Sequence, residues 1–366
     1  MKNKSFWNRA SAAAVLSWAV VANICGAGDL NPPAGAVEPT GKTLREIEPR
    51  TALTFENTPG DSGAAFIIPF TGSYYLTGNV TVGGRYAIEI ASFAGDVTID
   101  LMGYTITLIM GPQVNPTTGV YAPALATRTV TIRNGVIRNQ VATGTTGILI
   151  EGGANTVIED VRVQGVGRGI VVPDHSTVRR CDVSQIQSNF DDAAGIQTGL
   201  YSTVEHCRVR EVNTNGTTAH IRVGAFSVVR ECQIVGTAPC EIGIDVGSGS
   251  VVERNLIRND DSALAFTGIL SSGSLTARGN TLTNVTAGTS TGISCGGAST
   301  IQDNVFSGLD TGVSIGSASA CLIVRNHFRA SATDVQANFP ASNIIGPTVG
   351  SGGAAASSNP HANYSN

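Results

Sequence analysis

Several side chains that could carry acid–base chemistry gather in one stretch of this 366-residue sequence. A histidine can act as general acid or base near neutral pH. An arginine can bind a sugar carboxylate through two parallel hydrogen bonds, and paired carboxylates can share the proton transfers of glycoside cleavage. The candidates for catalysis are His220, Arg222, Asp245, Asp191 and Asp192. Gln197 and Glu241 lie in the same stretch and are the candidates for substrate binding.

These residues belong to a repeat. Eight segments share a short strand, a turn rich in glycine and serine, a second alternating strand and a variable loop. Their first aliphatic residues are Ile148, Ile170, Ile196, Ile221, Ile244, Ile269, Ile293 and Val313, at steps of 22, 26, 25, 23, 25, 24 and 20 residues. No single unit can bury its apolar face, but stacked units can. The repeat therefore predicts an all-β chain: a single-stranded right-handed parallel β-helix, or solenoid, of roughly ten coils.

The positions beside the first aliphatic residue carry the candidate chemistry. Seven segments have glycine before it, and one has His220; the position after it is Gln197, Arg222 and Asp245 in three consecutive segments. Period-2 alternation predicts that both neighbours face outward. Stacked coils would place these groups within about 5 to 10 Å of one another. The alternative is a solvated surface with an Arg222–Asp245 ion pair that contributes little.

A second column lies in the second strand of each segment. Its members are Val161, Cys181, Cys207, Cys232, Asn255, Asn280, Asn304 and Asn326. Stacked asparagines can bond amide to amide along the axis and satisfy buried polar groups. Stacked cysteines behave as small buried hydrophobes. We therefore expect an asparagine ladder, and free thiols rather than disulfides in the cysteine column.

The ends of the chain differ from the repeat. Residues 1–27 combine a basic start, an apolar run and a Cys25-Gly26-Ala27 cleavage site, which is typical of a signal peptide. We expect an N-terminal capping segment at 28–69, the β-helix at 70–340 and a flexible tail at 341–366. The expected location is secreted, periplasmic or cell-surface, with no membrane span after cleavage. The net charge is −4 and no basic patch stands out in the sequence, which argues against a nucleic-acid partner.

The "GI…TVxxCxV" and "GI…VxxN" repeats resemble those of the pectin-lyase-like superfamily, over roughly residues 70 to 340. The opening "PTGKTLREIEPRTAL" also resembles a group of secreted bacterial β-helix proteins without assigned activity. The resemblance implies the β-helix fold, which serves lyases, hydrolases and adhesins alike. Asp191-Asp192 matches the aspartate pair of the polygalacturonase-like hydrolases in type. His220 lacks the flanking glycines of their motif, and Arg222 lacks the lysine that follows.

Two functions stay open. One is a polysaccharide lyase or glycoside hydrolase that acts on acidic polymers; the other is a non-catalytic structural or adhesive module of the cell surface. Either would engage a polysaccharide or a cell-surface glycan. No cofactor is expected, because the acidic residues are too few for a convincing calcium site. The sequence leaves the oligomeric state open.

Overall fold

The computed structural model describes most of the chain from Glu48 onward, and residues 48–366 form one compact unit. The described ranges are 48–109, 117–124, 128–139, 144–153, 155–188, 193–214, 218–236, 241–260, 265–285, 289–316, 320–337, 343–350 and 359–365. The expected signal peptide and residues 28–47 of the expected cap lie outside them.

The described strands form three faces of a coil that repeats along one axis. Face 1 consists of β2 (Ala64–Ile68), β5 (Tyr86–Ile90), β8 (Thr118–Ala122), β10 (Thr146–Ile150), β12 (Arg168–Val172), β15 (Ala194–Thr198), β18 (Ala219–Val223), β21 (Ile242–Val246), β24 (Phe266–Ser271), β27 (Ser290–Cys295), β30 (Thr311–Ile315) and β33 (Thr333–Ala337). Face 2 consists of β1 (Thr51–Leu53), β3 (Gly72–Leu76), β6 (Val97–Asp100), the first halves of β9 (Val130–Asn139) and β11 (Val157–Gln164), β13 (Thr177–Arg179), β16 (Thr203–Glu205), β19 (Val228–Arg230), β22 (Ser250–Glu253), β25 (Leu275–Arg278), β28 (Thr300–Gln302), β31 (Leu322–Val324) and β34 (Ile344–Ile345). Face 3 consists of β4 (Val80–Val82), β7 (Thr105–Leu108), the second halves of β9 and β11, β14 (Asp182–Ser188), β17 (Arg208–Thr214), β20 (Gln233–Gly236), β23 (Leu256–Asn259), β26 (Thr281–Asn284), β29 (Val305–Ser307), β32 (His327–Arg329), β35 (Thr348–Gly350) and β36 (Asn363–Ser365).

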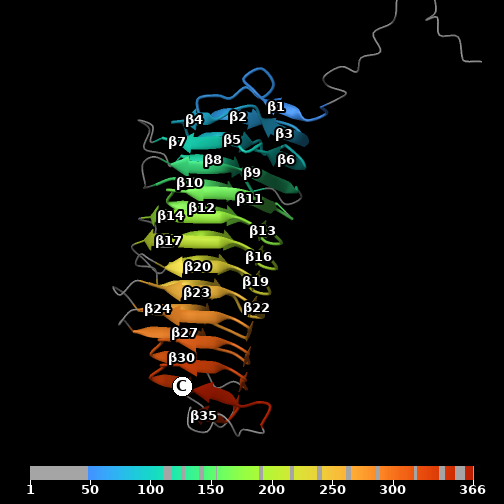
Figure 1. Ribbon diagram of the computed structural model, residues 1–366. Helices are drawn as coiled ribbons and strands as arrows, with labels where there is room; N and C mark the ends of the chain where they lie inside the picture. The colour runs from blue at the N-terminus through green and yellow to red at the C-terminus, as the bar shows by residue number, and fades with distance from the viewer. Residues whose placement is uncertain are drawn as a thin grey trace, which may run out of the picture. The chain divides into compact units, whose positions relative to one another are not determined.

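All the named strands pair in parallel with their equivalents in the neighbouring coils, and the coils lie one above the other (Figure 1). Faces 2 and 3 form one hydrogen-bonded sheet, because β9 and β11 continue through the corner between them. The described part of the chain contains no helix. The predicted all-β solenoid is confirmed. Its interior is one continuous hydrophobic core of side chains from all three faces, among them Ile196, Ile221 and Ile244, which are fully buried.

Face 1 departs from regular alternation at its glycine column. In β15 and β18 the register pairs Ala194 with Ala219 and Ile196 with Ile221, but Gly195 has no partner in it. A Cβ atom built on Gly195 would lie 2.5 Å from Cγ1 of Val209, a buried residue of face 3. The strand therefore turns two successive residues inward, as at a bulge. Only glycine leaves room there for the side chains of face 3.

The corner between faces 2 and 3 is a single residue with positive φ in nine successive coils. These residues are Asn134, Asp160, Arg180, His206, Glu231, Arg254, Gly279, Asp303 and Arg325. Where the next residue is an asparagine, its inward side chain satisfies backbone groups of the neighbouring coils. Asn280, for example, accepts hydrogen bonds at Oδ1 from the backbone nitrogen and Nδ2 of Asn255, both 3.0 Å away. Its own Nδ2 donates to the carbonyl of Val252 (2.9 Å) and to Oδ1 of Asn304 (3.0 Å). The predicted asparagine ladder is thus present.

The cysteine column continues this ladder toward the N-terminus. Sγ of Cys232 lies 3.7 Å from the carbonyl oxygen of Val204, which is the kind of backbone acceptor that the asparagine amides use in later coils. The backbone nitrogen of Cys232 donates to Oδ1 of Asn255 (2.9 Å), so the two columns join. Cys181, Cys207 and Cys232 are buried and free, as expected from the sequence.

The described strands extend beyond the predicted limits of the β-helix at 70 and 340. β1 and β2 already pair with β3 and β5. At the other end β34 and β36 extend faces 2 and 3. Asn363 supplies the next member of the ladder: its Oδ1 accepts from the backbone nitrogen (2.9 Å) and Nδ2 (3.2 Å) of Asn326. A buried hydrogen-bonding position therefore anchors a segment whose composition alone does not predict packing.

The ladder makes a direct prediction about stability. Replacing Asn280 with alanine leaves the donors of Asn255 and the carbonyl of Val252 without partners in the interior. We expect a loss of about 2–4 kcal/mol in the free energy of unfolding. Thr283→Ala, on the outer side of the same coil, is the control and should change it by less than about 0.5 kcal/mol. Urea unfolding followed by circular dichroism measures both, and equal effects would contradict the role given to the ladder.

The thiols should be inert in the folded protein. A hydrogen bond with Cys207, together with burial, raises the pKa of Cys181, and burial raises the pKa of Cys295 to about 11. Since the thiolate is the reactive form, alkylation at pH 8 should be slow at both residues. Peptide mapping after iodoacetamide treatment, with and without urea, measures this. Rapid labelling of Cys181 or Cys295 in the native protein would contradict the buried column.

Candidate functional site

Three of the residues predicted to form the site meet on the outer side of face 1. The register pairs Gln197 with Arg222 and Arg222 with Asp245, so they lie in a row across β15, β18 and β21. Nε of Arg222 lies 3.0 Å from Oδ2 of Asp245, and both side chains are partly buried. The row therefore contains the ion pair that the alternative interpretation predicts. Glu241, also partly exposed, immediately precedes β21.

The outward orientation predicted for His220 is wrong. It occupies the inward-facing glycine column, and its side chain is completely buried. Nδ1 lies 3.2 Å from the carbonyl oxygen of Ile242, which can only accept, so Nδ1 carries the proton. His220 is thus separated from the outer surface on which Arg222 and Asp245 lie. Its role as an acid or base stays a prediction, one that this burial disfavours.

The ring of His220 lies next to Gly236, which has no side chain to fill that space. Cε1 lies 3.5 Å from the place where a Cβ atom of Gly236 would be, on face 3 of the same coil. The next two coils reverse the arrangement: they have Gly243 with Asn259, and Gly268 with Asn284. In these three coils one of the two positions is a glycine and the other is a large polar residue. This explains the histidine of the repeat by packing.

The other predicted catalytic residues cannot be placed. Asp191 and Asp192 lie outside the described residues, so their proximity to Asp245 stays a prediction. Within the described ranges no group of three or more His, Cys, Asp or Glu residues could hold a metal ion. None of the described residues belongs to a helix long and apolar enough to cross a membrane.

A charged ladder beside the corner between faces 2 and 3 was not predicted from the sequence. The residue before seven successive corner residues alternates in sign, and Asp100, the register partner of Arg133, extends the series to eight coils: Asp100, Arg133, Glu159, Arg179, Glu205, Arg230, Glu253 and Arg278. Each arginine pairs with the carboxylate of the coil before it, for example Arg179 with Glu159 at 2.6 Å and Arg278 with Glu253 at 2.5 Å. Aligning the residues two positions before the asparagine and cysteine column would have revealed this alternation. Because its charges are paired with one another, we regard the ladder as structural.

An aromatic cluster on β5 and β8 was also missed, because the repeat alignment began only at Gly147. The rings of Tyr86 and Tyr121 stack with centroids 4.2 Å apart, and the guanidinium of Arg85 lies over the ring of Tyr86. The hydroxyl of Tyr121 donates to Glu151 (3.0 Å), while burial raises the pKa of neighbouring Glu89. Both faces of the Tyr86 ring are covered, so this ring offers no platform for a sugar.

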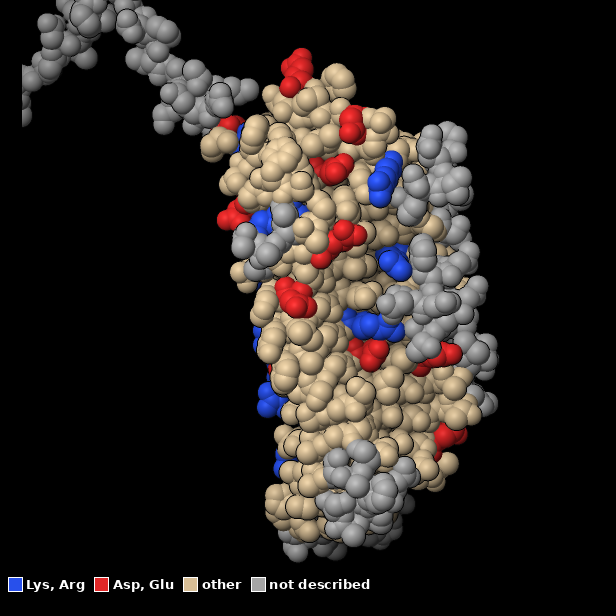
Figure 2. Space-filling model, turned by 180° about the vertical axis from the view of Figure 1, so that it is seen from behind, with Lys and Arg blue, Asp and Glu red and all other residues tan. Residues whose placement is uncertain are grey.

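Charges on the described surface are sparse and mixed when the molecule is seen from behind. Acidic and basic side chains lie singly or in small groups, and no continuous area of one sign is visible (Figure 2). In the later coils the outer column of face 1 becomes Ser294, Ser314 and Gln336. Residues with charge therefore concentrate in the earlier and middle coils of this face.

Comparison with known proteins agrees with this architecture. A family model described as "Right handed beta helix region" matches residues 146–290. The chain is a right-handed parallel β-helix protein. The predicted resemblance is confirmed at this level, that of the fold.

Two solved structures of PfbA, a surface adhesin of Streptococcus pneumoniae, are similar to the chain at 10% sequence identity. One alignment covers 73% of this chain and 82% of that chain with a TM-score of 0.37. The other covers 83% and 92% with a TM-score of 0.34. At these values the likeness carries no inference about function. A comparison with curated proteins finds no match.

The packing account of His220 makes a testable prediction. His220→Gly leaves a cavity beside Gly236 and should lower the free energy of unfolding by about 2–4 kcal/mol. Gly236→Asn alone places a second side chain against the ring and should cost about 1–3 kcal/mol. The double variant recreates the Gly243–Asn259 arrangement, so the two losses should not add, with a coupling of at least about 1 kcal/mol. Urea unfolding of the wild type, the two single variants and the double variant measures this double-mutant cycle. Additive losses in the free energy of unfolding would contradict the packing of His220 against Gly236.

Proposed function

We propose that this protein is a non-catalytic β-helix module, secreted or exposed on the cell surface, that binds a polysaccharide or cell-surface glycan along its side. The observation that carries the proposal is the burial of His220. Catalysis on a polymer needs an acid–base group that reaches the substrate at the surface. The interior position of this ring removes the histidine from the acid–base candidates of the site.

The neighbouring charges support the same conclusion. Arg222 and Asp245 satisfy each other at 3.0 Å, and neither side chain is fully exposed. An ion pair of this kind orders a surface and can accept hydrogen bonds from sugar hydroxyls, but Arg222 is not left free to bind a substrate carboxylate. Gln197 beside them adds an amide that can donate and accept. The row of Gln197, Arg222 and Asp245 can make weak polar contacts with a polysaccharide that lies across the coils.

The experiment combines binding and turnover for the full chain. Acidic and neutral polysaccharides are tested for binding by calorimetry, and for unsaturated products and new reducing ends with and without calcium. We expect binding of at least one polymer and no product. Asp245→Asn and Arg222→Gln are run beside Ser294→Ala, a control from the same outer column.

Turnover would contradict the proposal. Products that disappear in Asp245→Asn but persist in Ser294→Ala, with unchanged circular dichroism, would make the protein an enzyme and place its site on face 1. Products that persist in both variants would also make it an enzyme and would move the site away from this row.

A further inference from the structure

The arginines on the outer side of face 3 differ from the other arginines of the early and middle coils. Four of them lie on strands β9, β11 and β17, in two columns that run along the axis. They are Arg138, Arg162, Arg208 and Arg210. The register places Arg162 beside Asp182 and Asp182 beside Arg208, while Arg138, Gln164, Ser184 and Arg210 form the neighbouring column. With neighbouring strands about 4.8 Å apart, the four charges span three coil steps, roughly 14 Å.

These arginines are poorly neutralised. Asp182 is the one carboxylate in the two columns over these coils, and its Oδ2 lies 3.5 Å from Nε of Arg162 and 3.6 Å from Arg210. Both distances are too long for good hydrogen bonds. Arg208 is exposed and makes no ion pair with a described residue, and Arg162 has 58% of its side chain exposed. β17 carries one further carboxylate, Glu211, at a bend with φ of 55°, so the local balance stays positive.

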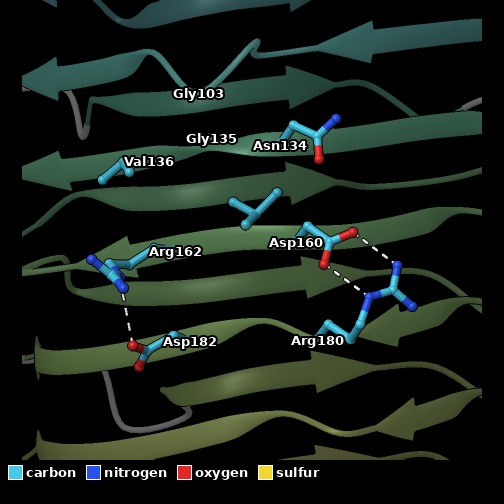
Figure 3. A pocket seen from close by; sticks show the side chains of 9 residues that line it. Gly103, Asn134, Gly135, Val136, Asp160, Arg162, Arg180 and Asp182 are labelled. Carbon is cyan, nitrogen blue, oxygen red and sulfur yellow. Dashed lines mark hydrogen bonds and ion pairs between the residues drawn. The ribbon is translucent and has the colours of Figure 1, made fainter.

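The arginines at and beside the corner between faces 2 and 3 provide the contrast within the same coils. Arg180 makes two hydrogen bonds of 2.8 Å to Asp160, which raise the pKa of the arginine and lower that of the aspartate. Arg179 is held by Glu159 in the same way. Figure 3 shows the Asp160–Arg180 pair beside the looser Arg162–Asp182 contact. Close ion pairing between coils is therefore available to this fold, whereas the four arginines of face 3 have only the two longer ion-pair contacts with Asp182 among the described residues.

The surface here is hollowed, with charged side chains at the edges of the hollow. A shallow depression lies between the two sets of charges, lined by Val136, Arg162, Asp182 and the corner pair. Gly103 and Gly135 contribute no side chains to it. Gln164 and Gln185, joined by a 2.8 Å hydrogen bond, add amide groups along the same face. Guanidinium groups bind carboxylates and sulfates, and amides bind hydroxyls, so together they match an acidic sugar polymer.

We propose that this part of face 3, the basic face of β9, β11, β14 and β17, is the binding site for an acidic polysaccharide bearing carboxylate or sulfate groups. The proposal rests on the proposed function and names its ligand class and its site. The polymer lies along the axis, with Arg162 and Arg208 on its anionic groups. Asp182 stands between them and limits the affinity by repulsion. A nucleic acid is disfavoured because the two columns carry no aromatic side chain on which bases could stack.

The test measures binding of the full chain to polygalacturonate and to heparin, with a neutral glucan and a single-stranded oligodeoxynucleotide as comparison ligands. We expect the acidic polymers to bind and the neutral glucan to bind far more weakly. Binding should fall steeply toward an ionic strength of about 1 M, where the Debye length is about 3 Å. The double variant Arg162→Gln/Arg208→Gln should bind about tenfold more weakly. Asp182→Asn should bind about two- to fivefold more tightly, because a repulsive charge is removed.

Arg325→Gln is the matched control: it also removes an arginine partly exposed at the surface, but one paired with Asp303 at 2.7 Å in a later coil. It should bind as the wild type does, and all variants should keep the circular dichroism spectrum. Unchanged affinity in Arg162→Gln/Arg208→Gln, with weaker binding in Arg222→Gln, would overturn this site and leave the proposed function standing. Failure of every polysaccharide to bind would overturn both. Tighter, arginine-dependent binding of the oligonucleotide would overturn the ligand class.

Discussion

The corner between faces 2 and 3 is the constraint on which the rest of the helix depends. Nine successive coils turn there on one residue with positive φ, and in four of them an asparagine follows and satisfies buried backbone groups. Asn255, Asn280, Asn304 and Asn326 do so by bonding to the coil before and the coil after. An unsatisfied buried donor is costly, so every coil must meet its neighbour in the same register. The strands of the three faces then pair in that same register, so differences in coil length fall in the loops.

The same register explains why charges outside the corner form pairs. Because corresponding residues of successive coils are about 4.8 Å apart, like charges in one column would repel and opposite charges attract. The alternation from Asp100 to Arg278 is the arrangement that avoids repulsion at every step. Pairs such as Arg278–Glu253, whose carboxylate is almost buried, gain more than exposed pairs do. The four arginines of face 3 share one carboxylate, Asp182, so their columns keep a net positive charge that an anionic ligand would offset.

The sequence was sufficient for the fold because its strongest signals are columns. The aliphatic period and the four asparagines predict the solenoid and the ladder without any three-dimensional information. The orientation of His220 was predicted wrongly, because strict alternation was assumed through a position where the strand turns two residues inward. Asn363 was missed because it lies 37 residues beyond Asn326, outside the period of 20 to 26 residues. Period-based reasoning fails where an insertion or a bulge interrupts the period.

Candidate functional residues in such a repeat are best judged by what the neighbouring coil offers them. Inward positions are fixed by packing, so even a histidine there is accounted for when it fills the space left by Gly236. Outward charges with a partner one coil away, such as Arg222 with Asp245, are accounted for by that partner. Arg208 has the opposite character: it is exposed, its neighbours along the column are Asp182 and Gln233, and it makes no ion pair within the described chain. A charged side chain that makes no ion pair with a neighbouring coil is therefore the best candidate for contact with a ligand.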